Sequence, residues 1–248
     1  MWILFSPEYI EYTLLGLVLL PGIIFASVMS LKVNLTFSKF YQVKSAKGYT
    51  GAEVANKILQ RKNILDVVIH QGDSDDLVDN FNPETGIVTL SKRVYGEDSV
   101  ASLAVAAHEI GHVIQHDEGY TPIKIRTVLA KTSSIMNAFV WPLIFIGIVF
   151  DFAYIGGIIG KAFLWAGVVF FGVTLLFSLV TLPVELNASK RGLQMLVETG
   201  SLDELEVKGA KKVLTAAAMT YVAAIVVSIL QLLRFVLFFL LNSRNDRR

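Results

Sequence analysis

The chain has 248 residues, of which 54% are hydrophobic and only 17% are charged. Ordinary soluble domains carry about 25% charged residues, so this composition argues against a soluble globular protein. The formal net charge of +1 excludes a polybasic nucleic-acid binder, and the absence of cysteine excludes disulfides, a thiolate nucleophile and a cysteine-ligated metal. Any chemistry must therefore use histidine, carboxylates, hydroxyls or the backbone.

Four stretches of 19 to 23 residues contain no Asp, Glu, Lys or Arg. At about 1.5 Å per residue, a helix of that length matches a hydrocarbon layer of ~30 Å. A soluble helical core is the less favoured alternative, because helices with a solvated face carry charges. The first stretch is too long for a signal peptide and lacks a basic segment before it, so we expect a retained anchor. The sequence thus predicts four transmembrane helices, at residues 12–31, 132–150, 162–184 and 213–233.

The remaining charges gather in two polar segments, which hold 24 and 10 of the 43 charged residues. If the second and third spans form a hairpin, both polar segments face the same side of the membrane and can share one site. Twelve basic residues flank the spans on that side and four on the other, which predicts that the polar segments are cytoplasmic. The predicted segments are an N-terminal anchor (1–31), an α/β domain (32–131), a transmembrane hairpin (132–184), a helical segment (185–212) and a C-terminal transmembrane helix with a basic tail (213–248).

The larger polar segment opens with signals for one helix and a short sheet. Thr50 and Glu53 form a capping box, which predicts a helix start. A β-rich run at residues 65–70 predicts one strand. The turn chemistry of Asn82–Gly86 precedes a second strand at residues 87–90.

Two further helices are expected beyond these strands. One runs from about residue 99 to 117, and Gly119 is its stop signal. The other lies in the second polar segment, from about residue 184 to 199, with Gly200 as its stop signal, and Pro183 predicts a kink or a restart where it begins. Ser201 with Glu204 then predicts a capping box that leads toward the last span.

The most informative motif is His108-Glu109-Ile110-Gly111-His112, an HExxH pattern on the helix at 99–117. Two histidines four residues apart lie one above the other on a helix, so both imidazoles can bind one metal ion. Zinc is the ion that such a site usually takes, and Glu109 stands beside it to deprotonate a water. The pattern is expected by chance about 0.003 times in a chain of this composition.

A catalytic zinc site needs a third protein ligand. The metzincin spacing fails, because that pattern requires Gly at position 115 and His at position 118, where this chain has Gln115 and Glu118. His116 is rotated away from His108 and is expected to shield or orient rather than to bind. Glu185 is the better candidate, since a carboxylate directly after a 23-residue uncharged run needs a partner or solvent. Ser189 follows one turn later and can hydrogen-bond a ligand.

These residues resemble a known family. The His108–His116 stretch, the Asn82-Pro83 turn with its strand, and the Leu182–Ser189 stretch are similar to the YugP-like bacterial membrane zinc metallopeptidases. The chain is more distantly similar to HtpX-type membrane gluzincins, which have Asp where this chain has Ser189. The resemblance implies one zinc ion on His108, His112 and Glu185, with Glu109 as general base and acid in peptide hydrolysis.

The expected fold class is a mainly α membrane protein with four transmembrane helices and a small α/β gluzincin-like metalloprotease domain that contains the HExxH helix and a short β-sheet. The expected location is the bacterial inner membrane, with the active site on the cytoplasmic side. The oxyanion donor is left open among four polar side chains, Tyr95, Tyr120, His116 and Arg191. We further expect a substrate to add alongside the strand at residues 87–90.

The predicted function is a membrane-embedded zinc endopeptidase that cleaves membrane or misfolded proteins near the membrane surface. Its partners would be a peptide or membrane-protein substrate and the lipid bilayer, with a membrane-protein complex left open. Nucleic acid and nucleotide are not expected, because the chain has neither a basic excess nor a phosphate loop. The alternative is a non-catalytic membrane scaffold or quality-control partner that retains zinc for folding.

Overall fold

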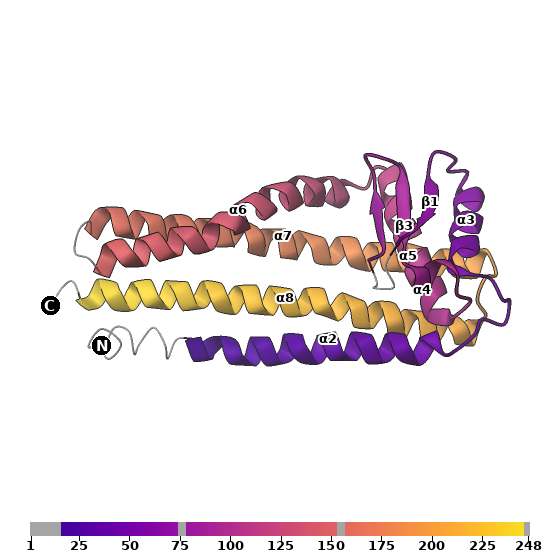
Figure 1. Ribbon diagram of the computed structural model, residues 1–248, viewed down its shortest axis with the longest axis horizontal. Coiled ribbons are helices and arrows are strands. Elements are labelled where there is room, and N and C mark those ends of the chain that lie inside the picture. The colour runs from indigo at the N-terminus through magenta and orange to yellow at the C-terminus, as the bar shows by residue number, and fades with distance from the viewer. Residues whose placement is uncertain (1–15, 74–77, 153–156, 246–248) are drawn as a thin grey trace. The chain divides into compact units, whose positions relative to one another are not determined.

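The computed structural model describes residues 16–73, 78–152 and 157–245, and the fold is mainly helical with one small sheet (Figure 1). The start of the predicted anchor, part of the loop after the first strand and the last three residues of the basic tail lie outside the described residues. The described elements, in chain order, are η2 (Leu17–Leu19), α2 (Leu20–Tyr41), α3 (Gly51–Lys62), β1 (Val68–Gln71), β2 (Asn80–Asn82), β3 (Ile87–Leu90), α4 (Lys92–Tyr95), α5 (Val100–Asp117), α6 (Thr121–Phe152), α7 (Gly157–Glu198) and α8 (Glu204–Asn245).

Four helices are long and apolar enough to cross a membrane, as the uncharged stretches predict. Each helix extends beyond its uncharged stretch into polar sequence, because the backbone hydrogen bonds of a helix do not depend on the polarity of the side chains. The candidate spans are Leu17–Tyr41, Thr121–Gly147, Trp165–Glu198 and Glu204–Leu237.

The chain divides into two compact units. The first contains Met1–Val28, Ile125–Thr181 and Tyr221–Arg248. Within it α6 packs closely on α7, since a Cβ at Gly167 would lie 2.8 Å from the side chain of Ile144. The second unit contains Met29–Lys124 and Leu182–Thr220, so it brings both polar segments together.

The core of the second unit forms around α5, which packs against α3. Val54 and Ile58 of α3 and Leu103 and Ile110 of α5 are all fully buried. The capping box of α3 is present as predicted: the Thr50 side chain accepts a hydrogen bond from the Glu53 backbone, and the Glu53 carboxylate accepts one from the Thr50 backbone.

The sheet has the strand order β1-β3-β2, with β1 parallel and β2 antiparallel to β3. Both predicted strands are present, and β2 is an addition to the prediction. The expectation that a substrate adds alongside β3 is wrong, because β3 is the central strand and both of its edges are already paired. A four-residue apolar run does not reveal whether its strand is central or at an edge.

The second polar segment differs from the prediction in two details. Of the kink or restart predicted at Pro183, the restart is absent, because Pro183 lies inside α7, which continues through it. The capping box before α8 uses Asp203 and Glu206: Asp203 Oδ1 accepts hydrogen bonds from the backbone of Leu205 and Glu206, and Glu206 Oε2 accepts one from Asp203. Ser201 cannot take this role, because its backbone N–H already closes the end of α7 on the Leu196 carbonyl.

Candidate metal centre

Helix α5 positions His108, Glu109 and His112. Its first turn is capped by Ser99, whose hydroxyl accepts a hydrogen bond from the Ser102 backbone at 3.1 Å. The rings of His108 and His112 lie one turn apart, with centroids separated by 4.8 Å. Glu109 is only 7% exposed. The helix therefore holds two imidazoles side by side, with a nearly buried carboxylate next to them in the chain.

Glu185 of α7 meets both histidines. Its Oε2 lies 3.2 Å from His108 Nε2 and 3.5 Å from His112 Nε2, and the residue is 3% exposed. His108, His112 and Glu185 each offer one possible metal-binding atom, and these three atoms all lie within 4.8 Å of one another. The structure thus brings together the three side chains that the sequence proposed as ligands, although 73 residues separate Glu185 from His112.

Two glycines allow α5 and α7 to approach this closely. A Cβ at Gly111 would lie 2.3 Å from the Ala188 carbonyl oxygen, and a Cβ at Gly192 would lie 2.5 Å from the Ala107 carbonyl oxygen. Both separations are far below van der Waals contact, so backbone meets backbone at each position. The close crossing delivers Glu185 to the histidines.

The outer ring nitrogens of both histidines have hydrogen-bond partners. His108 Nδ1 lies 3.0 Å from Ser189 Oγ, and His112 Nδ1 lies 3.0 Å from Gln115 Oε1. Gln115 Nε2 donates to the Val184 carbonyl at 2.8 Å, so Gln115 Oε1 is left to accept the Nδ1–H of His112. This arrangement directs the free lone pair of His112 Nε2 toward Glu185.

Gln115 was missed as a functional candidate by the sequence analysis, which considered position 115 only as a failed metzincin glycine. The residue is completely buried and also donates to Asn187 Oδ1 at 2.9 Å. A signal was available, since Gln115 lies three residues after His112 and therefore on the same helix face. Its burial against α7 depends on tertiary packing.

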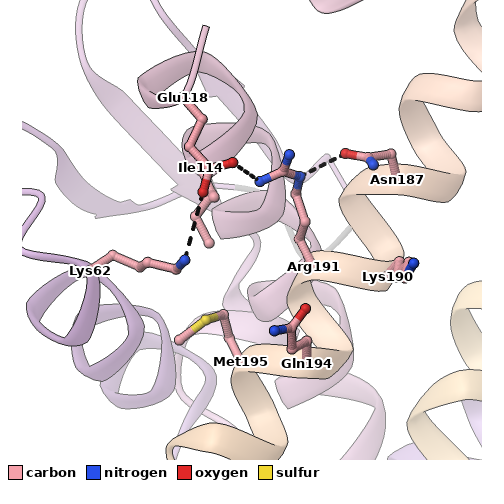
Figure 2. A pocket seen from close by; sticks show the side chains of 8 residues that line it. All are labelled: Lys62, Ile114, Glu118, Asn187, Lys190, Arg191, Gln194 and Met195. Carbon is pink, nitrogen blue, oxygen red and sulfur yellow. Dashed lines mark hydrogen bonds and ion pairs between the residues drawn. The ribbon is translucent and has the colours of Figure 1, made fainter. Parts of the chain in front are cut away.

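Arg191, an oxyanion candidate, lines a cavity of about 290 Å³ whose other labelled residues come from α3, α5 and α7 and from Glu118, which follows α5 directly (Figure 2). Its Nε donates to Asn187 Oδ1 at 2.7 Å, and its Nη1 donates to Glu118. Lys62 approaches the same carboxylate at 3.7 Å. The Arg191 guanidinium holds the pKa of Glu118 below its usual range, and Lys62 adds to this effect.

The other predicted candidates have different neighbours. The Arg191 guanidinium lies over the ring of Tyr120, with 5.7 Å between the Arg191 Cζ atom and the ring centroid. His116 packs edge-on against Phe81 of β2, with ring centroids 5.9 Å apart. Tyr95 belongs to α4 and packs against the hydrophobic core. Among the described residues, Ser189 is the predicted supporting side chain that forms a hydrogen bond to one of the two histidines, His108.

Asp79 is a half-buried carboxylate before β2. It accepts hydrogen bonds from the Ser91 backbone at 2.8 Å and from the Ser91 hydroxyl at 3.1 Å. Burial raises the pKa of Asp79, whereas the hydrogen bonds from Ser91 and the charge of a protonated His108 oppose this rise. The surroundings of the site therefore contain a carboxyl that favours its protonated form more than a solvated aspartate does.

The donor set suits zinc. Two imidazole nitrogens and one carboxylate oxygen form a common catalytic zinc set, which leaves a fourth position open. Tetrahedral bonds of about 2.0–2.1 Å separate neighbouring ligand atoms by roughly 3.3 Å. The separations of 3.2 Å and 3.5 Å between Glu185 Oε2 and the two histidine Nε2 atoms match this spacing.

Comparisons with known proteins agree with this chemistry. The family model described as "Putative neutral zinc metallopeptidase" matches residues 15–240. "Putative membrane protease YugP" of Bacillus subtilis (strain 168) is 38% identical over 216 residues, which cover 87% of this chain and 91% of that protein. No solved structure matches the chain. Since both similarities extend over most of the sequence, the chain belongs to the neutral zinc metallopeptidase family, as the resemblance to YugP-like proteins predicted.

Proposed function

We propose that this protein is a zinc-dependent endopeptidase of the HExxH gluzincin type, with His108, His112 and Glu185 as the ligands of one zinc ion. The observation that carries the proposal is the approach of Glu185 Oε2 to within 3.2 Å and 3.5 Å of the two histidine Nε2 atoms. A buried acidic side chain between two imidazoles is costly without a cation or a proton to compensate it.

Glu109 would act as general base and acid. Bound zinc would supply Lewis-acid polarisation of a water and of the substrate carbonyl. Glu109 accepts a proton from the attacking water and returns it to the nitrogen of the leaving amine, so the peptide bond breaks with no net proton change on the enzyme. Ser189 and Gln115 hold the two imidazoles in orientation through their outer nitrogens.

The substrate would be a membrane-proximal or misfolded protein segment on the cytoplasmic side of a bacterial inner membrane. Glu185 directly follows an uncharged 23-residue stretch of α7, which supports a site close to the membrane surface. Among the described strands β2 has an unpaired outer edge, and it packs on α5 through Phe81 and His116. An extended substrate segment would therefore pair with the outer edge of β2 through main-chain hydrogen bonds, and not with β3.

The test uses the full-length protein purified in detergent, with zinc measured by elemental analysis and cleavage measured on an unfolded protein substrate. Glu109→Gln should retain stoichiometric zinc and lose about 10²- to 10⁴-fold in cleavage rate. Glu84→Gln, at an exposed turn, is the matched control and should cleave as the native chain does.

The non-catalytic alternative makes a different prediction. A scaffold that uses zinc only for folding would bind zinc but would show the same background cleavage with and without the Glu109→Gln change. Unchanged hydrolysis in this variant would refute the enzymatic proposal. The position of Glu109 between two ligand histidines favours the enzyme, because a structural zinc site has no need of a base.

A further inference from the structure

A groove between α2 and α8 lies outside the candidate metal centre and has a volume of about 560 Å³. This volume is within the range of small-molecule sites, roughly 300–1,000 Å³. The two helices are in contact here, since a Cβ at Gly209 near the start of α8 would lie 2.7 Å from the ring of Phe40 near the end of α2. All residues that line the groove belong to the second compact unit.

The groove is lined by one sign of charge. No acidic residue is among the lining side chains. The charged residues of the lining are all lysines, namely Lys32, Lys39, Lys208, Lys211 and Lys212. All five are exposed, and no ion pair with an acidic group is described for any of them. The carboxylate of Glu206 on α8 accepts hydrogen bonds from the backbone N–H groups of Ala46 and Asp203. Because the lining holds five ammonium groups and no carboxylate, the potential inside the groove is positive.

The spacing of these residues brings them to one face of each helix. On α2, Lys32, Thr36 and Lys39 repeat at intervals of four and three residues. On α8, Lys208 and Lys212 are one turn apart, with Lys211 beside them. The remaining lining is partly apolar and includes Phe40, Ala216 and Met219. The groove thus combines ammonium groups with hydrocarbon surface.

The lysines also stand at the ends of the two spans. Residues 12–31 before Lys32 and residues 213–233 after Lys212 contain no charged side chain. If these stretches lie in the hydrocarbon layer, the ammonium groups are at the level of the lipid headgroups. Basic pockets between membrane helices at this depth suit phosphate-bearing headgroups, and the apolar lining suits the start of an acyl chain.

We propose that this groove is a binding site for an anionic phospholipid, whose phosphate is bound by the lysines and whose glycerol and upper acyl chain lie along Ala216 and Met219. Charge complementarity selects an anionic over a zwitterionic lipid. The apolar lining and the position at the span ends select a lipid over a free anion. The proposal requires α2 and α8 to span the membrane, and it is independent of the catalytic assignment.

The binding test uses the full-length protein in nanodiscs of phosphatidylcholine with increasing fractions of phosphatidylglycerol. The readout is the enrichment of phosphatidylglycerol over phosphatidylcholine among the lipids that stay bound to the protein after mild detergent extraction, together with thermal stability. The groove variant K39Q/K208Q/K211Q/K212Q removes four lysines. Electrostatic attraction near a membrane is worth about fivefold in affinity per lysine, so we expect at least a tenfold loss of lipid affinity and loss of the lipid-induced rise in Tm.

The matched control is K47Q/K92Q/K124Q/K131Q, which removes the same charge from four exposed lysines outside the groove. It should bind lipid nearly as the native chain does, and an equal loss in both variants would overturn the proposal by indicating diffuse attraction. A further experiment adds inorganic phosphate as a competitor of the lipid. Competition by millimolar phosphate at constant ionic strength would show a site for free anions and would also overturn it. Unchanged zinc content in both variants checks folding.

Discussion

Each histidine of the candidate metal centre uses both nitrogens of its ring. Nε2 faces Glu185, and Nδ1 has a separate partner, Ser189 for His108 and Gln115 for His112. A partner on Nδ1 fixes the tautomer and the ring orientation, and so raises metal affinity. The two partners come from different helices, α7 and α5, so the orientation of the histidines depends on the packing of both.

Ser189→Ala should raise the zinc dissociation constant about 10- to 100-fold, because His108 loses the hydroxyl that orients its ring. Competition with a chromophoric zinc chelator measures this constant. Ser189→Thr keeps the hydroxyl and should recover part of the affinity. Ser178→Ala, on the same helix with its hydroxyl bonded to the Thr174 carbonyl, is the control. Equal affinities for Ser189→Ala and the native chain would exclude the orienting role.

The raised pKa of Asp79 has a consequence for stability. Because burial raises this pKa, the unfolded chain releases the Asp79 proton at a lower pH than the folded chain does. The contribution of Asp79 to the free energy of unfolding therefore falls as the pH rises from the unfolded pKa, about 3.9, through the folded pKa, and it stays low above that value.

Asp79→Asn removes this titration. The free energy of unfolding of the variant relative to the native chain should increase as the pH rises above about 4. Denaturant titrations of zinc-free protein at several pH values measure the difference, since a cation near His108 would add its own field. The same substitution at exposed Asp66 is the control. A relative stability that decreases with rising pH would contradict the burial effect.

At the scale of elements, the crossing of α5 and α7 decides whether the three ligands meet. At this crossing Gly111 faces the Ala188 carbonyl and Gly192 faces the Ala107 carbonyl, so the two helices touch through their backbones. The hydrophobic core supports the same contact, since Ile114 of α5 and Leu196 of α7 are buried in one cluster. Residues that carry no chemistry thus control the geometry of those that do.

Gly111→Ala and Gly192→Ala should each separate the helices, because the added methyl would lie 2.3 Å or 2.5 Å from a carbonyl oxygen. Overpacking of this kind costs about 1–3 kcal/mol, which exceeds the gain of about 1 kcal/mol from higher helix propensity. Zinc affinity and thermal stability should fall together. Gly172→Ala on α7, where the added methyl would meet no other helix or side chain within 4 Å, should be neutral or stabilising. Unchanged zinc affinity in both crossing variants would contradict this role.

At the scale of the whole molecule, the proposed function requires both polar segments on one side of the membrane. The cysteine-free sequence allows single cysteines to report this directly. Leu65 and Leu205 are 82% and 74% exposed and belong to the two polar segments, whereas Ile159, at 53% exposure, begins the second helix of the predicted hairpin.

Leu65→Cys and Leu205→Cys should both be protected from a membrane-impermeant thiol reagent in intact cells and labelled in inverted vesicles. Ile159→Cys should show the reverse pattern, since it lies at the far end of the hairpin. Labelling is detected as a mass shift on a gel. If Leu65→Cys and Leu205→Cys react from opposite sides, the two polar segments cannot form one active site in this membrane.

Local patterns in the sequence predicted the four apolar helices, the capping box at Thr50, the strand at Ile87 and the helix that carries His108 and His112. These features depend on residues within one turn or one strand of each other, so neighbouring side chains are sufficient evidence for them. The errors arose where a residue has competing partners. Ser201 closes α7 and so is not available to cap α8, and the edges of β3 are occupied by strands from elsewhere in the chain.

The sequence by itself determined that the chain has four long apolar helices and a pair of histidines one helical turn apart with an acidic neighbour, because composition and helical period are local properties. Tertiary structure alone decided that Glu185 reaches those histidines, that Gln115 and Ser189 orient them, and that lysines of α2 and α8 line one groove. The physical reason is that close approach between distant helices depends on which side chains are absent at the crossing as much as on which are present.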